Sequence, residues 1–182
     1  MELITLTDED VLNSRKRAIE LGTLHKSFTR GRGNETGMQG EYAVATFVKA
    51  VAAEDTYDYD LVSPLGVKIE VKTKGTTRKG APEPHYMATV ATANTKQACD
   101  VYVFCRALKT RSDFLLGKVW VMGYMLREEF YSKAVFYKKG DMDPSNGYLV
   151  QQDCWNVPIG DLYQWSSRSE REIISACHNL TV

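Results

Sequence analysis

Residues 57–74, YDYDLVSPLGVKIEVKTK, decide the fold of this 182-residue chain. The second half alternates strictly, because Val67, Ile69 and Val71 fall on one face of an extended strand and charged residues fall on the other. The SPLG sequence at 63–66 supplies a tight turn, since proline fixes φ and glycine tolerates a left-handed backbone. The stretch therefore predicts a β-hairpin with one apolar and one charged face.

The charged face of this hairpin gathers carboxylates and a lysine. Asp58 and Asp60 alternate with apolar residues on the first strand, and Glu70 and Lys72 lie on the second. Mg²⁺ prefers oxygen ligands, so carboxylates from adjacent strands can hold it while leaving room for a phosphate and a water. A lysine on the same face can orient that water and offset the developing negative charge. We therefore predict a divalent-metal phosphodiesterase site.

An acidic side chain also stands on a predicted helix before the hairpin. The helix is expected to begin near Thr36, and Val44 and Val48 mark its buried face, which Glu41 shares. A carboxylate there is costly unless a cation meets it, whereas an acid favoured by the helix N-terminus would turn sideways to water. Both interpretations of Glu41 stand at this point. Gln97, after the hairpin, could be a polar accessory of the site, but it is interpreted as a satisfied surface glutamine.

The remaining segments alternate between helical and extended patterns. The expected elements are a helix from a Thr7 cap to about Lys26, strands over 87–92, 100–107, 119–124 and 148–151, and helices over 126–134 and 166–179. Together with the hairpin, this order predicts an α/β fold in which helices flank a mixed central sheet. The length and the 43% hydrophobic content suit one domain.

The charge distribution is balanced overall but uneven along the chain. The 23 basic and 23 acidic residues cancel, which counts against a non-specific nucleic-acid binder without excluding a local basic groove. Loops on both sides of the hairpin are basic, and we expect contacts with a DNA backbone from five residues there. They are Arg30, Arg32, Lys74, Arg78 and Lys79.

The cysteines and histidines indicate whether a structural zinc site is present, and the cysteines and the N-terminus indicate the cellular compartment. The four cysteines and three histidines are dispersed, which argues against a structural zinc cluster and favours free thiols in a reducing compartment. The N-terminus lacks the basic start and apolar run of a secretory signal, and no window is long enough to span a membrane. We therefore expect a soluble, cytoplasmic protein with no membrane partner.

In this order, Glu41, Asp60 and Glu70-Val71-Lys72 resemble the motifs of the PD-(D/E)xK, or restriction-endonuclease-like, nuclease superfamily. The resemblance covers roughly residues 36–125, with 126–182 as docking elements of the same 1–182 domain. It implies a restriction-endonuclease-like core. It also implies Mg²⁺-dependent endonucleolytic cleavage of DNA to 5′-phosphate and 3′-hydroxyl ends, with Mn²⁺ as a substitute.

The site residues of the superfamily correspond to five positions in this chain. They are the metal ligands Asp60 and Glu70, the backbone carbonyl of Val71, the catalytic lysine Lys72 and the auxiliary helix acid Glu41. One departure is that Tyr59 precedes Asp60 where the family pattern has proline, and Asp58 stays an alternative ligand on the same strand face.

Other functions stay open beside the nuclease. One is a nuclease-fold DNA-binding module that is catalytically inactive, and the other is a small interaction protein whose charged strand face is merely solvated. Within the nuclease hypothesis, too few residues follow the core for a sizeable recognition domain. Cutting both DNA strands would therefore require a homodimer.

Overall fold

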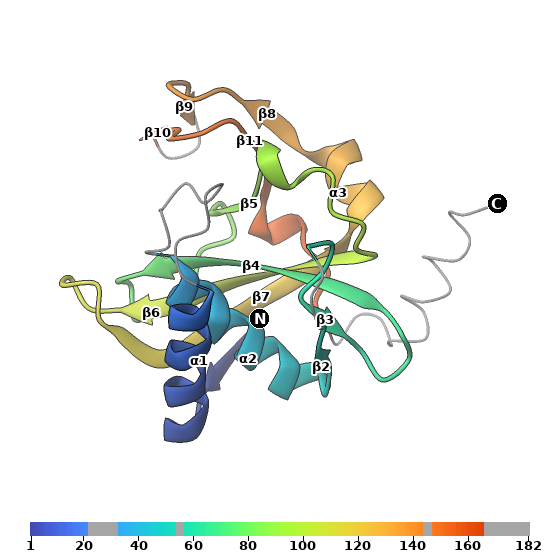
Figure 1. Cartoon of the computed structure of the whole chain (residues 1–182). Coiled ribbons are helices and arrows are strands. Elements are labelled where there is room, and N and C mark those ends of the chain that lie inside the picture. Colours follow the sequence, from blue (N-terminus) through green and yellow to red (C-terminus); the bar gives the residue numbers. More distant parts are fainter. Residues whose placement is uncertain (22–32, 54–56, 144–146, 166–182) are drawn as a thin grey trace.

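The computed structural model describes residues 1–21, 33–53, 57–143 and 147–165, which form a mixed α/β fold (Figure 1). A six-stranded sheet in the order β1-β7-β6-β4-β3-β2 lies at its centre. Its strands are β1 (Glu2–Thr5), β2 (Val51–Ala52), β3 (Leu61–Val62), β4 (Lys68–Thr76), β6 (Val101–Lys109) and β7 (Leu115–Leu126). Since β4 and β6 are parallel and the other neighbours antiparallel, the predicted mixed sheet is confirmed.

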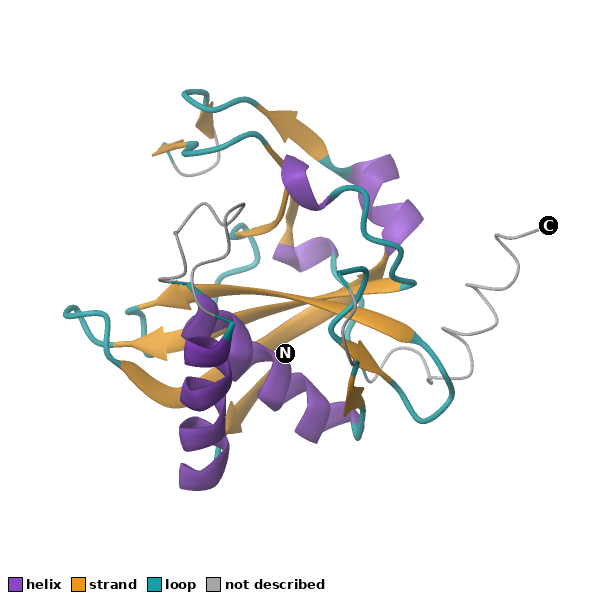
Figure 2. Cartoon of the chain, in the orientation of Figure 1, coloured by secondary structure: helices purple, strands orange, loops and turns teal. Residues whose placement is uncertain are grey.

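Two layers cover the sheet, one on each face (Figure 2). Helices α1 (Asp8–Glu20) and α2 (Asn34–Val48) lie over the first face, where Ala43 and Val44 pack on the core. The second face carries a second core beneath helix α3 and a three-stranded sheet of order β5-β11-β8. These elements are α3 (Arg127–Lys133), β5 (Met87–Ala91), β8 (Val135–Tyr137) and β11 (Cys154–Pro158).

The predicted hairpin forms, but its first strand is much shorter than expected. Strand β3 contains only Leu61 and Val62, which pair with Ile69 and Lys68 of β4. Gly66 takes the left-handed conformation predicted for the turn, with φ of 87°. Residues 57–60 lie outside the strand, because aspartates disfavour strands and bond readily to nearby backbone groups.

The α2 helix approaches β4 closely through a glycine. A Cβ atom on Gly40 would lie 1.8 Å from the Thr73 hydroxyl oxygen, so any larger residue would push the helix away from the strand. This contact brings α2 against β4, so that Glu41, the next residue of α2, lies within reach of the charges of Glu70 and Lys72. The helix begins at Asn34 after a Gly33 cap, so the predicted start near Thr36 was wrong by two residues.

The other boundaries follow the sequence pattern to different degrees. The Thr7 cap of α1 is confirmed, and Asp10 completes a capping box, but the helix ends at Glu20 rather than near Lys26. The strands expected over 87–92, 100–107 and 119–124 and the helix over 126–134 are present as β5, β6, β7 and α3. The expected helix over 166–179 lies outside the described residues.

Several small elements add to this framework. The edge strand β1, which pairs with β7, and strand β8 were not predicted, because both are too short to show a periodic pattern. The expected strand over 148–151 is present as β10. The remaining elements are β9 (Met142–Asp143), β10 (Tyr148–Leu149) and the 3₁₀ turns Thr92–Asn94 and Ile159–Asp161.

Candidate functional site

Four predicted site residues share one electrostatic neighbourhood where α2, the hairpin and β4 meet. Glu41 comes from α2, Asp60 immediately precedes β3, and Glu70 and Lys72 project from β4. The charges of Glu70 and Lys72 act on both Glu41 and Asp60. The fold therefore brings together side chains that are up to 31 positions apart in the sequence.

A buried ion pair lies at the centre of this acidic cluster, defined as Glu41, Asp60 and Glu70. Lys72 Nζ donates to Glu70 Oε1 at 2.6 Å, and only 14% and 5% of the two side chains are exposed. The other carboxylate oxygen, Glu70 Oε2, is buried and has no hydrogen-bond partner. An unsatisfied buried carboxylate oxygen is costly, so a further cationic or protic partner at this atom would stabilise it.

Gln97 completes the network, although its sequence context had indicated a surface side chain. It is only 5% exposed, and its amide donates to Glu70 Oε1 at 2.8 Å and to the backbone carbonyl of Tyr57 at 3.0 Å. Its own carbonyl oxygen accepts from Lys72 Nζ at 2.9 Å. The interpretation of Gln97 as a surface residue was wrong, and no local pattern marks a single glutamine in a loop as a partner of a distant strand.

The two candidate aspartates make different contacts. Asp60 Oδ2 accepts from the backbone N–H of Val71 at 2.7 Å, which holds this carboxylate against β4 and beside Glu70. Asp58 Oδ1 instead faces the loop before β6, where it accepts from the Ala98 N–H at 3.4 Å. Asp60 is therefore the aspartate that the fold brings into the acidic cluster.

The acidic cluster contains more negative than positive charge, and its carboxylates repel one another. Burial raises the pKa of Asp60 well above its usual value, and the charges of Glu70 and Glu41 raise it further. Burial, followed by the charge of Glu70, raises the pKa of Glu41 to about 7. Lys72 opposes both shifts without cancelling them, so an additional cation among these carboxylates would be favourable.

The raised pKa of Glu41 predicts a pH-dependent stability. Between pH 4.5 and about 7 the folded chain binds more protons than the unfolded chain, so the free energy of unfolding falls as pH rises through this window. Glu41→Gln should remove about 1–2 kcal/mol of that fall, given about 1.4 kcal/mol per pKa unit and the partial exposure of Glu41. Urea unfolding at pH 5 and pH 8 without metal measures it.

A matched control for this experiment is Glu128→Gln, which removes an exposed acid from α3. The control variant should retain the pH profile of the wild type. Asp60 contributes in the same direction as Glu41, so a smaller fall should persist in Glu41→Gln. An identical pH profile in all three proteins would contradict the account of Glu41.

The acidic cluster can be compared with the needs of a divalent cation. Within the four described ranges, no group of three or more histidine, cysteine, aspartate or glutamate side chains is already arranged as a metal site. Mg²⁺ does not need such a cage, because one or two carboxylates plus waters commonly suffice. Asp60 and Glu70 supply those carboxylates, and the unpartnered Glu70 Oε2 fits this chemistry.

The basic residues expected to contact DNA are found in different situations. Arg30 and Arg32 lie outside the described residues. Arg78 is exposed and forms an ion pair with Glu83 at 2.5 Å, and Lys79 is also exposed. Lys74 lies on the same face of β4 as Glu70 and Lys72, and its ammonium donates to the Thr89 hydroxyl at 2.6 Å. Of these five, Lys74 is the one that β4 aligns with the acidic cluster.

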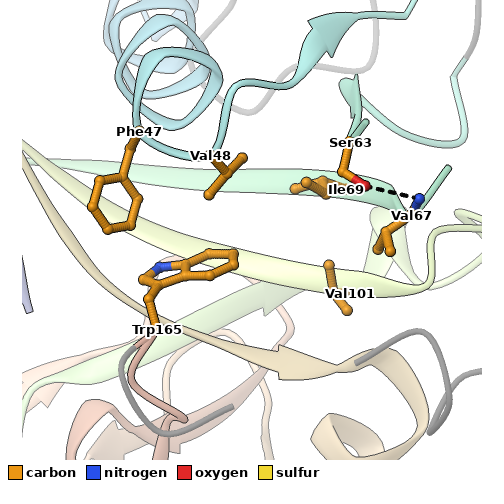
Figure 3. A pocket seen from close by; sticks show the side chains of 7 residues that line it. All are labelled: Phe47, Val48, Ser63, Val67, Ile69, Val101 and Trp165. Carbon is orange, nitrogen blue, oxygen red and sulfur yellow. Dashed lines mark hydrogen bonds between the residues drawn. The ribbon is translucent and has the colours of Figure 1, made fainter. Parts of the chain in front are cut away.

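An apolar cavity of about 220 Å³ lies between the C-terminal end of α2 and the apolar face of the hairpin, which carries Val67 and Ile69 (Figure 3). The polar groups of its lining are the Ser63 hydroxyl, which accepts from the Val67 N–H at 3.1 Å, and the Trp165 indole N–H, and no lining side chain is charged. We therefore assign the chemistry to the acidic cluster and not to this cavity. The lining residues are Phe47, Val48, Ser63, Val67, Ile69, Val101 and Trp165.

Comparison with known proteins adds no identification. No model of a known protein family matches the chain, and no curated protein is significantly similar to it. In the described part of the chain, no helix has the length and apolar character needed to cross a membrane.

Proposed function

We propose that this chain is a Mg²⁺-dependent DNA endonuclease with a restriction-endonuclease-like core in a single domain. It hydrolyses phosphodiester bonds to 5′-phosphate and 3′-hydroxyl ends. The observation that carries the proposal is the buried pair of Glu70 and Lys72 with Asp60 held beside it through Val71. Two carboxylates that can hold a divalent cation, with a lysine beside them, can support phosphodiester hydrolysis, because they supply a metal-activated water and positive charge against the phosphate.

Each residue of the cluster has a role in this proposal. Asp60 and Glu70 would hold the Mg²⁺ ion, with the Val71 carbonyl and Glu41 as further oxygen donors. When bound, Mg²⁺ or a substituting Mn²⁺ would supply positive charge against the phosphate and make a water molecule a better nucleophile. The raised pKa values of Asp60 and Glu41 support this assignment, because a cation would relieve the repulsion among these carboxylates.

Lys72 supplies the positive charge that belongs to the protein itself. Its ammonium is held by Glu70 and by Gln97, so its position is fixed before any substrate arrives. From there it would orient the attacking water and stabilise negative charge on the phosphate oxygens. Gln97 contacts no reacting atom in this scheme, and it is a positioning residue for Lys72 and Glu70.

A single acidic cluster per chain can cut one strand at a time. Cleavage of both strands of a duplex would therefore use two copies of the chain, with one cluster on each strand. Light scattering of the protein with and without duplex DNA measures this. A monomer that makes double-strand breaks at a rate first order in protein would contradict the homodimer.

The proposal is tested by incubating the protein with a panel of DNA substrates in Mg²⁺ or Mn²⁺. The panel contains supercoiled, linear, single-stranded and branched DNA, and EDTA serves as the control. We expect nicking or cutting of at least one substrate, abolished by EDTA, with products that a DNA ligase can rejoin because they carry 5′-phosphate and 3′-hydroxyl ends. Binding without cleavage would instead indicate an inactive DNA-binding module, and neither binding nor cleavage an interaction protein.

A further inference from the structure

Two cations stand side by side on the sheet, next to the acidic cluster. Lys74 of β4 and Arg106 of β6 are register partners in the parallel pair, so their side chains leave the same face of the sheet. Thr89, which accepts from Lys74, donates in turn to Asn156 Oδ1 at 2.6 Å. The Arg106 guanidinium lies 5.0 Å from the centre of the Tyr86 ring. Elements of the second layer thus hold both cations in place.

Neither cation is held in an ion pair with an acid within the described residues, although the charge of the buried Asp143 acts on Lys74. Lys74 and Arg106 form no ion pair with a carboxylate there, and the Arg106 Nε atom is buried without a hydrogen-bond partner. Lys74 is exposed as a residue, but burial around its ammonium, followed by the charge of Arg106, lowers its pKa to about 8, and the charge of Asp143 opposes this shift. An anion between the two side chains would compensate both positive charges.

Other basic residues nearby, unlike Lys74 and Arg106, form ion pairs with carboxylates. Arg78 pairs with Glu83 at 2.5 Å, and Lys109, also on β6, pairs with Asp113 at 2.6 Å. These side chains have their charges balanced by neighbours, so they have less to gain from an external anion. Lys74 and Arg106, which stand together on the sheet, have no such ion pair.

The position of this pair identifies the anion. Two residues along a strand advance by about 6.6 Å, so Lys74 follows Lys72 by a step comparable with one nucleotide of a DNA strand. The planar guanidinium of an arginine suits the oxygens of a phosphate, and a lysine adds a point charge. We infer that Lys74 and Arg106 form a phosphate subsite that binds the DNA backbone next to the phosphate that is cut. This inference rests on the proposed function.

The test measures DNA binding without cleavage. Binding of a fluorescein-labelled 12-nucleotide DNA, single-stranded or duplex, is followed by anisotropy in EDTA over a range of salt concentrations. Lys74→Met and Arg106→Met should each raise Kd about 5–10-fold, as expected for loss of one charged contact. The double variant should reduce the salt dependence of log Kd by about 0.9 if the two cations share one phosphate.

Two further variants control for charge and for folding. Lys49→Asn removes a positive charge from the C-cap of α2, on the opposite face, and asparagine tolerates the left-handed backbone there, so Kd should stay within twofold of wild type. Arg106→Lys keeps the charge and should recover the salt dependence but not the full affinity. Melting temperatures of all variants confirm that they are folded. Kd values for Lys74→Met and Arg106→Met equal to that of Lys49→Asn would overturn the subsite, as would no DNA binding by the wild type.

The subsite and the nuclease can fail separately. If the wild type cuts no DNA in Mg²⁺ but the Lys74 and Arg106 variants still lose binding in EDTA, the proposed function fails and the subsite stands. If the wild type cuts DNA, the same variants should raise KM with kcat within about twofold, because this contact is equally strong before and during the reaction. Active enzyme with unchanged KM in both variants would reject the subsite alone.

Discussion

Replacing Glu70 by glutamine should lower the rate of DNA cleavage by about 10³-fold without unfolding the protein. Glutamine keeps the shape of the side chain and can still accept hydrogen bonds from Lys72 and Gln97 through its carbonyl oxygen. It lacks the negative charge with which Glu70 would hold a divalent cation. Initial rates of plasmid nicking in Mg²⁺, with melting temperatures measured in parallel, separate loss of activity from loss of structure.

Asp60→Asn should behave in the same way, because Asp60 is the second proposed ligand. The matched control is Glu128→Gln, in which an exposed acid on α3 is neutralised and the rate should stay within about twofold of wild type. A folded Glu70→Gln protein that nicks DNA at the rate of the control would contradict the role of Glu70. Full activity in both ligand variants would remove the acidic cluster from the mechanism.

Replacing Lys72 by methionine should destabilise the fold by about 3 kcal/mol at pH 8, because it leaves the buried Glu70 carboxylate without its cation. Urea unfolding of wild type and Lys72→Met at pH 8 measures this cost. The rate of cleavage should also fall at least about 10²-fold, because the charge that faces the phosphate is lost.

The double variant Glu70→Gln/Lys72→Met separates the ion pair from packing. It removes both charges, so it should recover most of the stability that Lys72→Met loses, while remaining inactive. If Lys72→Met is as stable as the wild type, the pair is not shielded from water as its 5% and 14% exposed fractions indicate. If the double variant is no more stable than Lys72→Met, the unpaired charge of Glu70 is not what destabilises Lys72→Met.

The sequence pattern predicted the parts of the fold that carry strong periodicity. The apolar residues Val67, Ile69 and Val71 form one buried face of the hairpin, as their alternation indicated, and the apolar run at 100–107 lies within the central strand β6. The pattern failed where elements are short. Strand β1 and the two-residue strand β3 are defined by their partners in the sheet, and no local signal specifies such pairing.

The residues of the candidate site also differ in how far the sequence alone could assign them. Glu70 and Lys72 could be paired from the sequence because they are two residues apart on one strand. The choice between Asp58 and Asp60 needed the structure, since it depends on which aspartate bonds to Val71. Gln97 could not be assigned, because its partners are on another segment of the chain.

The position of Arg106 beside Lys74 could not be predicted from the sequence. Arg106 follows an apolar strand sequence and has no motif around it, and only the parallel register of β4 and β6 places it beside Lys74. Residues that meet across a parallel pair are separated by a crossover connection, here 32 positions, so their spacing carries no pattern that a reader of the sequence could use.

The central claim is that Asp60 and Glu70 bind a divalent cation. Thermal unfolding in a Mg²⁺ titration at pH 8 tests this claim most directly, because the experiment needs no knowledge of the DNA substrate. Metal that binds only the folded chain should stabilise it by about 2.7 kcal/mol at 100 times Kd, so the wild-type melting temperature should rise with the logarithm of Mg²⁺ concentration. The Asp60→Asn/Glu70→Gln variant should show no such rise. A flat wild-type curve, or an equal rise in the variant, would contradict the claim.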